Sequence, residues 1–298
     1  MSGHTSRLSL NFLRKKTQPD SLLDGDVTVE KFTKLTYSTP EDPWISSFLI
    51  QLVEFLTGRF PLERKFNQVL NSNKTPSLIW QELVEACGLK LNYDPKQLAK
   101  IPVNEPVIFI ANHPFGVVDG MVMAFLAAQK FPKFKLLVNG VLCTDELLNN
   151  FFLPIDFGSN KKALQTNIQT RTLAIEKIKS GEPIVIFPAG GVATAPSCWK
   201  KAEDLEWKRF VVKLIHKAEA TVIPIYFHGQ NSRLFQMVSQ FSQDLRLALL
   251  LFEVRNKMHK TLKIEIGNPI TFKEMNSQTK KNDLLNFLYH QVFSLNKT

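Results

Sequence analysis

Between residue 104 and about residue 270, short apolar runs of strand length alternate with longer stretches in which apolar residues recur at helical spacing. The strand-like runs are residues 107–111, 135–138, 153–156, 184–187, 222–227 and 262–266, and the clearest helix-like stretches are residues 162–179 and 205–220. Strands that alternate with helices are typical of an α/β protein whose strands run parallel. We therefore predict a largely parallel central sheet flanked by helices, with functional groups on loops past the carboxyl ends of the strands.

The chain before this region has a different character and forms an N-terminal helical extension. We predict a basic, flexible N-terminal segment (residues 1–40), a helical lead-in (residues 41–100) and an α/β domain (residues 101–298). Within the lead-in, residues 44–56 carry apolar side chains at helical spacing. Such a helix can lie at a membrane interface or pack on the protein core, and we favour packing on the core.

The excess of positive charge limits the classes of partner. The 298 residues carry a net charge of +10, and the sequence pI is about 9.4. A basic surface attracts nucleic acid, anionic lipid or an acidic protein. The basic residues occur in short groups, and neither an RNA-binding signature nor a recognition-helix pattern is present. We therefore expect no nucleic-acid partner, while the charge does not choose between a membrane surface and an acidic protein.

The cysteines and the apolar runs bear on the compartment. Cys87, Cys143 and Cys198 are widely separated, and the sequence contains neither a CxxC nor an HExxH motif. This pattern suggests neither a disulfide framework nor a zinc site, so we expect reduced thiols in a cytoplasmic protein. No stretch reaches the roughly 18 consecutive apolar residues of a spanning helix, so we expect the chain not to cross a membrane.

The strongest candidate for catalytic chemistry directly follows the apolar run 107–111. It reads Asn-His-Pro-Phe-Gly-Val-Val-Asp-Gly over residues 112–120, with His113 and Asp119 as its ionisable groups. One imidazole nitrogen of such a histidine can take a proton from a hydroxyl, while the other donates to the carboxylate, which fixes the tautomer. The alternative is an ordinary turn, because proline and glycine punctuate the segment and aspartate often caps a helix.

Two further motifs follow predicted strands. The first is Phe-Pro-Ala-Gly-Gly over residues 187–191, whose paired glycines allow a ligand to approach backbone N–H groups closely. The second lies over residues 228–235 and contains Asn231 and Arg233. Arginine can hold a phosphate or carboxylate through two parallel hydrogen bonds. The alternatives are a plain turn for the first motif and a capped helix start with a solvated Arg233 for the second.

The motifs together resemble the sequence blocks of the glycerolipid acyltransferase superfamily, whose members move a fatty acyl chain from a thioester to a lysolipid. The segments that carry the resemblance are residues 113–119, 187–190 and 222–225. The likeness covers roughly residues 45–270. It is closer to a bacterial branch labelled hemolysin or lyso-ornithine-lipid-type O-acyltransferase, which has a similar Asn-His-Pro-Phe-Gly block and similar segments at residues 229–235 and 245–250.

The resemblance implies an O-acyltransferase in which His113 is the general base and Asp119 orients it. It implies no metal and no bound cofactor, because acyl-ACP or acyl-CoA is a co-substrate. The implied partners are a lysolipid acceptor, the carrier protein or CoA thioester, and the cytoplasmic face of the inner membrane. The residues expected to bind substrate are Asn112, Phe115, Gly116, Phe187, Pro188, Gly190, Gly191, Asn231, Arg233, Lys161 and Lys162.

The chain departs from the superfamily's pattern in three places. Five residues rather than the usual four separate His113 from Asp119, and Ala189 stands where the pattern has a glutamate. The usual glycine and arginine of the phosphate block are not evident near residues 153–158. The basic residues that could replace them are Lys161, Lys162 and Arg171. These departures favour an acceptor other than glycerol phosphate, such as an amino-acid-linked lysolipid. Two alternatives stay open, a non-catalytic lipid-binding protein on this scaffold and a thioesterase or esterase.

Overall fold

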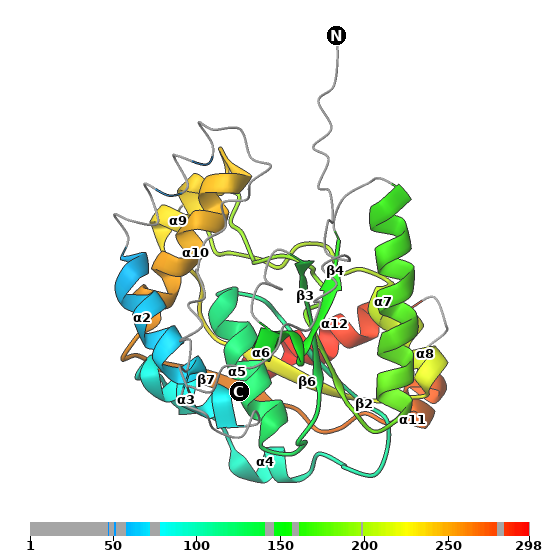
Figure 1. Cartoon of the computed structure of the whole chain (residues 1–298). Helices are drawn as coiled ribbons and strands as arrows, with labels where there is room; N and C mark the ends of the chain where they lie inside the picture. The colour runs from blue at the N-terminus through cyan, green and yellow to red at the C-terminus, as the bar shows by residue number, and fades with distance from the viewer. Residues whose placement is uncertain are drawn as a thin grey trace, which may run out of the picture.

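The computed structural model describes residues 47, 51, 58–71, 78–140, 146–156, 161–197, 199–278 and 283–297. The predicted flexible segment 1–40 lies outside these residues, as does the predicted helix 44–56 apart from Ser47 and Gln51. The described chain forms a seven-stranded sheet with helices on both faces, as Figure 1 shows. The predicted α/β class is therefore confirmed.

The sheet is largely parallel, as predicted. Its strands are β1 (Lys90–Asn92), β2 (Val107–Ala111), β3 (Lys135–Asn139), β4 (Phe152–Ile155), β5 (Ile184–Ile186), β6 (Thr221–Phe227) and β7 (Thr261–Ile266). They lie in the order β1-β7-β6-β2-β5-β3-β4. Strands β6, β2, β5, β3 and β4 run parallel, whereas β7 pairs antiparallel with β6 and parallel with β1. The carboxyl ends of the five parallel strands therefore meet at one edge.

The helices divide between the two faces of the sheet. They are α2 (Arg59–Leu70), α3 (Ile79–Ala86), α4 (Pro95–Ala99), α5 (Val117–Ala128), α6 (Glu146–Asn149), α7 (Lys161–Lys179), α8 (Phe210–Ala218), α9 (Arg233–Val238), α10 (Gln243–Lys257), α11 (Phe272–Gln278) and α12 (Leu284–Ser294). Buried residues of α2, α3, α5 and α10 share one hydrophobic cluster, and those of α7, α8, α11 and α12 share another. The sheet lies between these two clusters (Figure 1).

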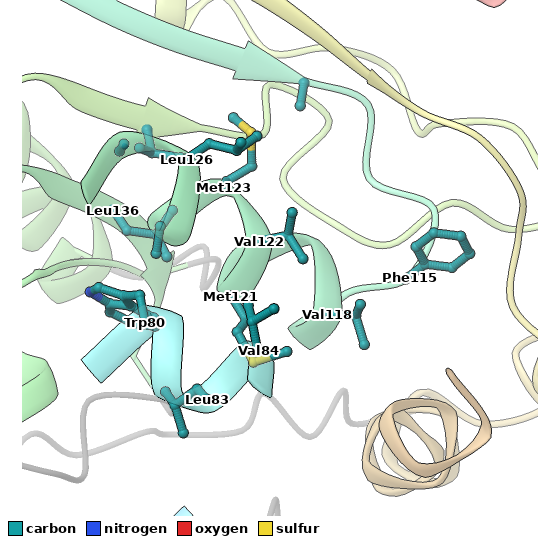
Figure 2. Packing of buried hydrophobic residues seen from close by; sticks show 14 of the residues in the cluster. Trp80, Leu83, Val84, Phe115, Val118, Met121, Val122, Met123, Leu126 and Leu136 are labelled. Carbon is teal, nitrogen blue, oxygen red and sulfur yellow. The ribbon is translucent and has the colours of Figure 1, made fainter. Parts of the chain in front are cut away.

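Strand β2 shows why both faces are covered. All five of its residues are buried; Phe109 belongs to the first cluster, whereas Ile108 and Ile110 belong to the second. A strand buried on both sides needs a continuous apolar sequence, which Val-Ile-Phe-Ile-Ala supplies. Figure 2 shows buried side chains of α3 and α5 in the first cluster, among them Trp80 and Met121.

The lead-in packs on the same core as the sheet. Leu62 of α2 and Leu83 of α3 belong to the first hydrophobic cluster together with Phe109. The lead-in is not wholly helical, because β1 is a three-residue strand that extends the sheet beside β7. Its residues are exposed or half-buried, so the strand lacks the apolar run that reveals the others in the sequence.

The predicted helix over residues 205–220 is shorter in the structure, where α8 spans Phe210–Ala218. Trp207 lies in the loop before it, buried and hydrogen-bonded through its indole N–H to Asp204, which holds this stretch outside the helix. At the other end Glu219 has a φ of +51°, a left-handed conformation that ends the helix.

Candidate active site

The three strands that carry the sequence motifs are neighbours, in the order β5-β2-β6. In the middle of β2, Ile110 pairs with Ile186 on one side and with Pro224 on the other. Because the three strands are parallel, the segments that follow them leave the sheet at the same edge. The structure therefore brings the three motifs together, although they lie far apart in the sequence.

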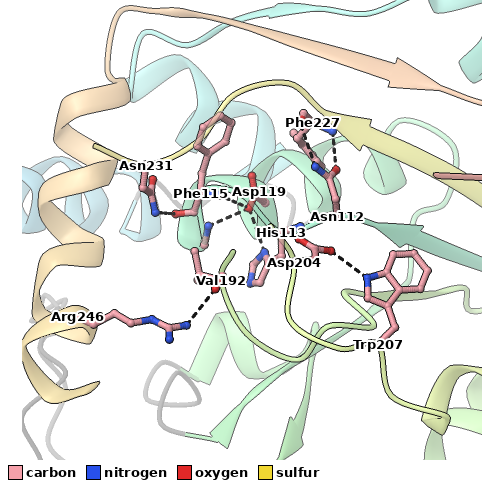
Figure 3. A network of polar contacts seen from close by, with 11 residues as sticks. Asn112, His113, Phe115, Asp119, Val192, Asp204, Trp207, Phe227, Asn231 and Arg246 are labelled. Carbon is pink, nitrogen blue, oxygen red and sulfur yellow. Dashed lines mark hydrogen bonds and ion pairs between the residues drawn. The ribbon is translucent and has the colours of Figure 1, made fainter. Parts of the chain in front are cut away.

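His113 and Asp119 form a hydrogen-bonded pair at this edge (Figure 3). His113 Nδ1 lies 3.0 Å from Asp119 Oδ2. The same oxygen accepts the backbone N–H groups of Phe115 and Gly116 at 2.7 and 2.9 Å. This oxygen can only accept when the carboxylate is ionised, so Nδ1 is the donor, and in the neutral imidazole the lone pair is then on Nε2. The Asp119 side chain is fully buried and that of His113 is 15% exposed, so a substrate can reach the imidazole but not the carboxylate.

The turn at Gly116 accommodates the five residues between the histidine and the aspartate. Helix α5 begins at Val117, so Asp119 lies in its first turn. Gly116 has a φ of +85°, in the left-handed region that glycine adopts without strain. A Cβ at this position would lie 2.8 Å from Leu250 Cδ2, so the site also needs glycine for space.

The backbone of His113 is held on both sides by the loop that follows β5. Ala193 N–H donates to the His113 carbonyl at 2.8 Å, and His113 N–H donates to Asp204 Oδ1 at 3.0 Å. Thr194 and Glu203 pair through two backbone hydrogen bonds and close the loop between these contacts. The loop therefore fixes the peptide groups of His113 while Asp119 fixes its ring.

Asp204 is in turn held by aromatic packing. Its Oδ2 atom accepts the indole N–H of Trp207 at 3.0 Å (Figure 3), and the Trp207 ring meets Tyr289 of α12 edge-on at 5.3 Å. Burial raises the pKa of Asp204, while the hydrogen bonds from the His113 backbone and from Trp207 act in the opposite direction. Asp204 is thus a second carboxylate at the site, placed behind the His113 backbone.

Phe187 packs against the histidine, and the two glycines follow it in the loop after β5. The Phe187 ring stacks on the His113 ring with centroids 4.0 Å apart and planes 20° from parallel, which restricts rotation of the imidazole. Gly190 has a φ of +68°, and its N–H donates to the Phe187 carbonyl at 2.9 Å. That bond removes Gly190 from the candidate oxyanion donors. The Gly191 N–H has no hydrogen-bond partner among the described residues.

The two residues between Phe187 and Gly190 are structural. Pro188 is buried and its carbonyl accepts the Lys208 N–H at 2.8 Å. Ala189 is 1% exposed and lies in the second hydrophobic cluster with Trp207. The position where the superfamily's pattern has a glutamate is therefore part of the core here. The contact of Pro188 with substrate stays a prediction.

Three more residues predicted to bind substrate serve the fold through their side chains. Asn112 joins two strand ends, since its Nδ2 donates to the Phe227 carbonyl at 2.9 Å and its Oδ1 accepts the Phe227 N–H at 2.7 Å. Phe115 is 2% exposed, and the Lys257 ammonium lies 4.7 Å from its ring centroid. Asn231 is buried and donates to the Phe115 carbonyl at 3.4 Å. These side chains hold the loop that carries His113, and their contact with substrate stays a prediction.

Arg233, one of the predicted basic ligands, contacts Trp199. Arg233 is exposed and stacks its guanidinium over the Trp199 ring at 4.6 Å, while Ser232 caps α9. The structure thus shows the capped helix start that was the alternative for this motif. Lys161 is exposed at the start of α7, and the side chain of Lys162 lies outside the described residues.

Arg246 of α10 is a basic side chain that does reach the site. Its Nη2 atom donates to the Val192 carbonyl at 3.1 Å, beside the loop that holds His113 (Figure 3). The same atom would lie 3.6 Å from a Cβ at Gly191, and burial lowers the pKa of the guanidinium. In the sequence, Arg246 was noted only as part of a similar segment, because nothing local shows that α10 lies beside the loop that follows β5.

The described residues contain no group of three or more His, Cys, Asp or Glu side chains that could hold a metal ion. In the same part of the chain, no helix has both the length and the apolar character needed to cross a bilayer.

Comparison with known proteins identifies the family of the chain. A family model described as Acyltransferase matches residues 59–298, which include the sheet and every site residue named above. The chain belongs to this acyltransferase family. Asp204 of this acyltransferase is a site residue that the sequence did not single out. It lies 91 positions from His113 in the chain, and the closed loop brings it into hydrogen-bond contact with the His113 backbone.

Two known relatives align with this acyltransferase over most of its length. A lyso-glycine lipid O-acyltransferase of Phocaeicola vulgatus is 25% identical over 280 residues, which are 90% of this chain and 95% of the relative. A protein of the same name from Bacteroides thetaiotaomicron is 26% identical over 254 residues, 82% of this chain and 88% of the relative. The crystal structure of the 1-acyl-sn-glycerophosphate acyltransferase PlsC from Thermotoga maritima aligns with a TM-score of 0.46 and 12% identity, over 85% of this chain and 96% of that chain.

Proposed function

We propose that this acyltransferase moves a fatty acyl chain from an acyl thioester to the hydroxyl of a lysolipid, with His113 as the general base. The observation that carries the proposal is the His113–Asp119 pair: one ring nitrogen bonds to a buried carboxylate, and the ring keeps partial exposure. A neutral imidazole with a free Nε2 lone pair is the group that removes a proton from an alcohol near neutral pH.

The chemistry needs no covalent intermediate on the protein. His113 Nε2 takes the proton of the acceptor hydroxyl as its oxygen attacks the thioester carbonyl carbon. The tetrahedral intermediate expels the thiolate, which takes the proton back from the imidazolium, so that an ester and a free thiol leave. The buried Asp119 carboxylate stabilises the imidazolium between these two steps, and general-base help of this kind contributes about 10²- to 10⁴-fold.

The developing negative charge on the thioester oxygen needs a donor. The Gly191 N–H is the candidate, since it has no partner within the described chain and lies in the loop that follows Phe187. The guanidinium of Arg246, bonded beside it to the Val192 carbonyl, is the candidate to face a phosphate or carboxylate of either substrate.

The acceptor that fits best is a lysolipid linked to an amino acid. Two relatives are named lyso-glycine lipid O-acyltransferase. In this chain Ala189 stands in place of the glutamate of the superfamily's pattern, and it is buried in the core. Such an acceptor is a bilayer lipid, so we place the reaction at the cytoplasmic surface of the membrane. The donor is acyl-ACP or acyl-CoA, both of them anionic partners for a protein of net charge +10.

The test is an acyl-transfer assay read by mass spectrometry. Purified full-length protein is supplied with acyl-ACP or acyl-CoA and a panel of lysolipids that includes lyso-glycine lipid, and is compared with His113→Ala. A diacyl product that requires His113 supports the proposal. Free fatty acid without a diacyl product indicates a thioesterase, and full turnover by His113→Ala overturns the general-base role. Absence of any product from folded protein would favour a non-catalytic lipid-binding role.

A further inference from the structure

A group of exposed apolar side chains lies beside the loop that holds His113. Trp199 is 77% exposed and Phe241 is 82% exposed, the two highest values among the large apolar residues of the described chain. Leu234 and Met237 of α9 are 43% and 45% exposed. Single exposed apolar residues are ordinary, but several on adjoining segments mark an interaction site.

These four residues lie on adjoining segments, and together they are here called the aromatic rim. The Arg233 guanidinium carbon lies 4.6 Å from the centroid of the Trp199 ring, which places the tip of the loop against the start of α9. Leu234 and Met237 are three residues apart on α9 and therefore share a face. Phe241 follows in the turn that ends the helix, where its N–H donates to the Val238 carbonyl at 3.0 Å.

The rim is joined firmly to the active-site loop. The Ala195 N–H donates to Oε1 of Gln236, a fully buried residue on the inner face of α9, at 2.9 Å. The Ala202 N–H donates to Gln230 Oε1 at 2.9 Å. The same loop holds the backbone of His113 at its base. A membrane surface that contacts the rim would therefore lie close to the loop that holds His113.

The charges around the rim are mostly positive. Residues 195–203 contain Lys200, Lys201 and one acid, Glu203, and residues 233–241 contain Arg233 and no acid. Both lysines and Arg233 are exposed. Aromatic rings among cations suit an interface in which the rings enter the headgroup layer and the cations meet anionic lipid.

We propose that the aromatic rim is the surface by which this protein rests on an anionic bilayer, with Trp199 and Phe241 at headgroup depth. This inference rests on the proposed function, because a lysolipid acceptor reaches His113 from the same bilayer. Cations alone would suit an acidic carrier protein equally well. The projecting rings favour lipid, since a bilayer can receive two rings that stand out from the surface.

The test is vesicle sedimentation of the full chain. The vesicles contain phosphatidylcholine alone or phosphatidylcholine with phosphatidylglycerol, and the variant is the double substitution Trp199→Ser/Phe241→Ser. Val103→Ser is the matched control, because Val103 is 49% exposed and precedes β2 at the opposite edge of the sheet. We expect the wild type to bind the anionic vesicles preferentially, the double variant to bind on the order of tenfold more weakly, and the control to bind as the wild type does.

A second arm separates this inference from the proposed function. Turnover is compared for a lysolipid held in vesicles and for a short-chain lysolipid dissolved as monomers. We expect the double variant to lose more of the vesicle turnover than of the monomer turnover. Wild-type vesicle binding by the double variant overturns the inference, as does a loss of acyl-ACP binding without a loss of vesicle binding. Vesicle binding that needs the rim in a protein without acyl transfer would overturn the proposed function alone.

Discussion

Asp119 serves the His113 ring and the backbone of its own loop through a single oxygen: Oδ2 lies 3.0 Å from His113 Nδ1 and accepts the N–H groups of Phe115 and Gly116. One carboxylate therefore fixes both the tautomer of the His113 imidazole and the turn that carries it. Substitutions at the two positions should separate the chemistry from the folding.

Both His113→Ala and Asp119→Ala should lose acyl transfer, by about 10²-fold or more. Only Asp119→Ala should also lose stability, because it leaves two buried backbone N–H groups without an acceptor, at about 1–3 kcal/mol for each. Urea unfolding of the two variants beside the wild type measures the difference. Equal stability of the two variants would contradict the bridging role of Asp119.

Asp204→Asn should lower kcat by about 10- to 100-fold with little change in KM. The amide keeps one acceptor oxygen but turns its NH₂ group toward either the His113 N–H or the Trp207 N–H, so the His113 backbone shifts. Glu203→Gln is the control, since it removes the exposed neighbouring carboxylate. A kcat for Asp204→Asn equal to that of Glu203→Gln would show that the hydrogen bond from the His113 backbone to Asp204 does not position His113 for turnover.

The same variant should change the pH dependence of stability. Burial raises the folded-state pKa of Asp204 above its ordinary value of 3.8, so the native state holds that proton more tightly than the unfolded state does. This group's contribution to stability is therefore greatest at low pH and declines as the pH rises from 3.8 through the folded pKa. Asp204→Asn lacks this decline. Thermal unfolding across that pH range measures the effect. If the Tm of the wild type and that of the variant changed with pH in parallel, the decline would not come from Asp204.

Gly116→Ala should destabilise the fold more than Gly181→Ala. Both glycines have a positive φ, +85° and +87°, so both variants carry a conformational cost. Only at Gly116 would the added Cβ meet a neighbour, Leu250 Cδ2 at 2.8 Å, whereas nothing lies within 4 Å at Gly181. Chemical denaturation of the two variants gives the difference directly. A larger loss at Gly181 would be inconsistent with this packing.

Cys87 should resist alkylation in the folded protein. Burial raises its pKa from 9.0 to about 11, which lowers its thiolate fraction at pH 8 by about a hundredfold, and the side chain is only 2% exposed. Iodoacetamide treatment followed by peptide mass mapping should modify Cys87 only after denaturation. Rapid modification of the native protein would show that this part of the first hydrophobic cluster opens readily.

The sequence by itself determined the alternation of strands and helices and the identity of the His113–Asp119 pair. Apolar runs such as residues 107–111 are legible because a strand buried on both faces has to be continuously apolar. Strand β1 was not predicted, because its three residues are exposed or half-buried and form no apolar run. The carboxyl-edge rule also indicated that the three motifs would meet, since parallel strands end at one edge.

Only the tertiary structure decided which side chains of those motifs face the site. The sequence predicted that Asn112 and Asn231 bind substrate. In the structure the Asn112 side chain is hydrogen-bonded to the Phe227 backbone, and the Asn231 side chain to the Phe115 carbonyl. Conversely, Asp204 reaches His113 through a loop closed by long-range bonds, which no local pattern records. A motif fixes which groups are available. Their orientation depends on contacts between residues far apart in the chain, and these form only when the whole sheet and its helices assemble.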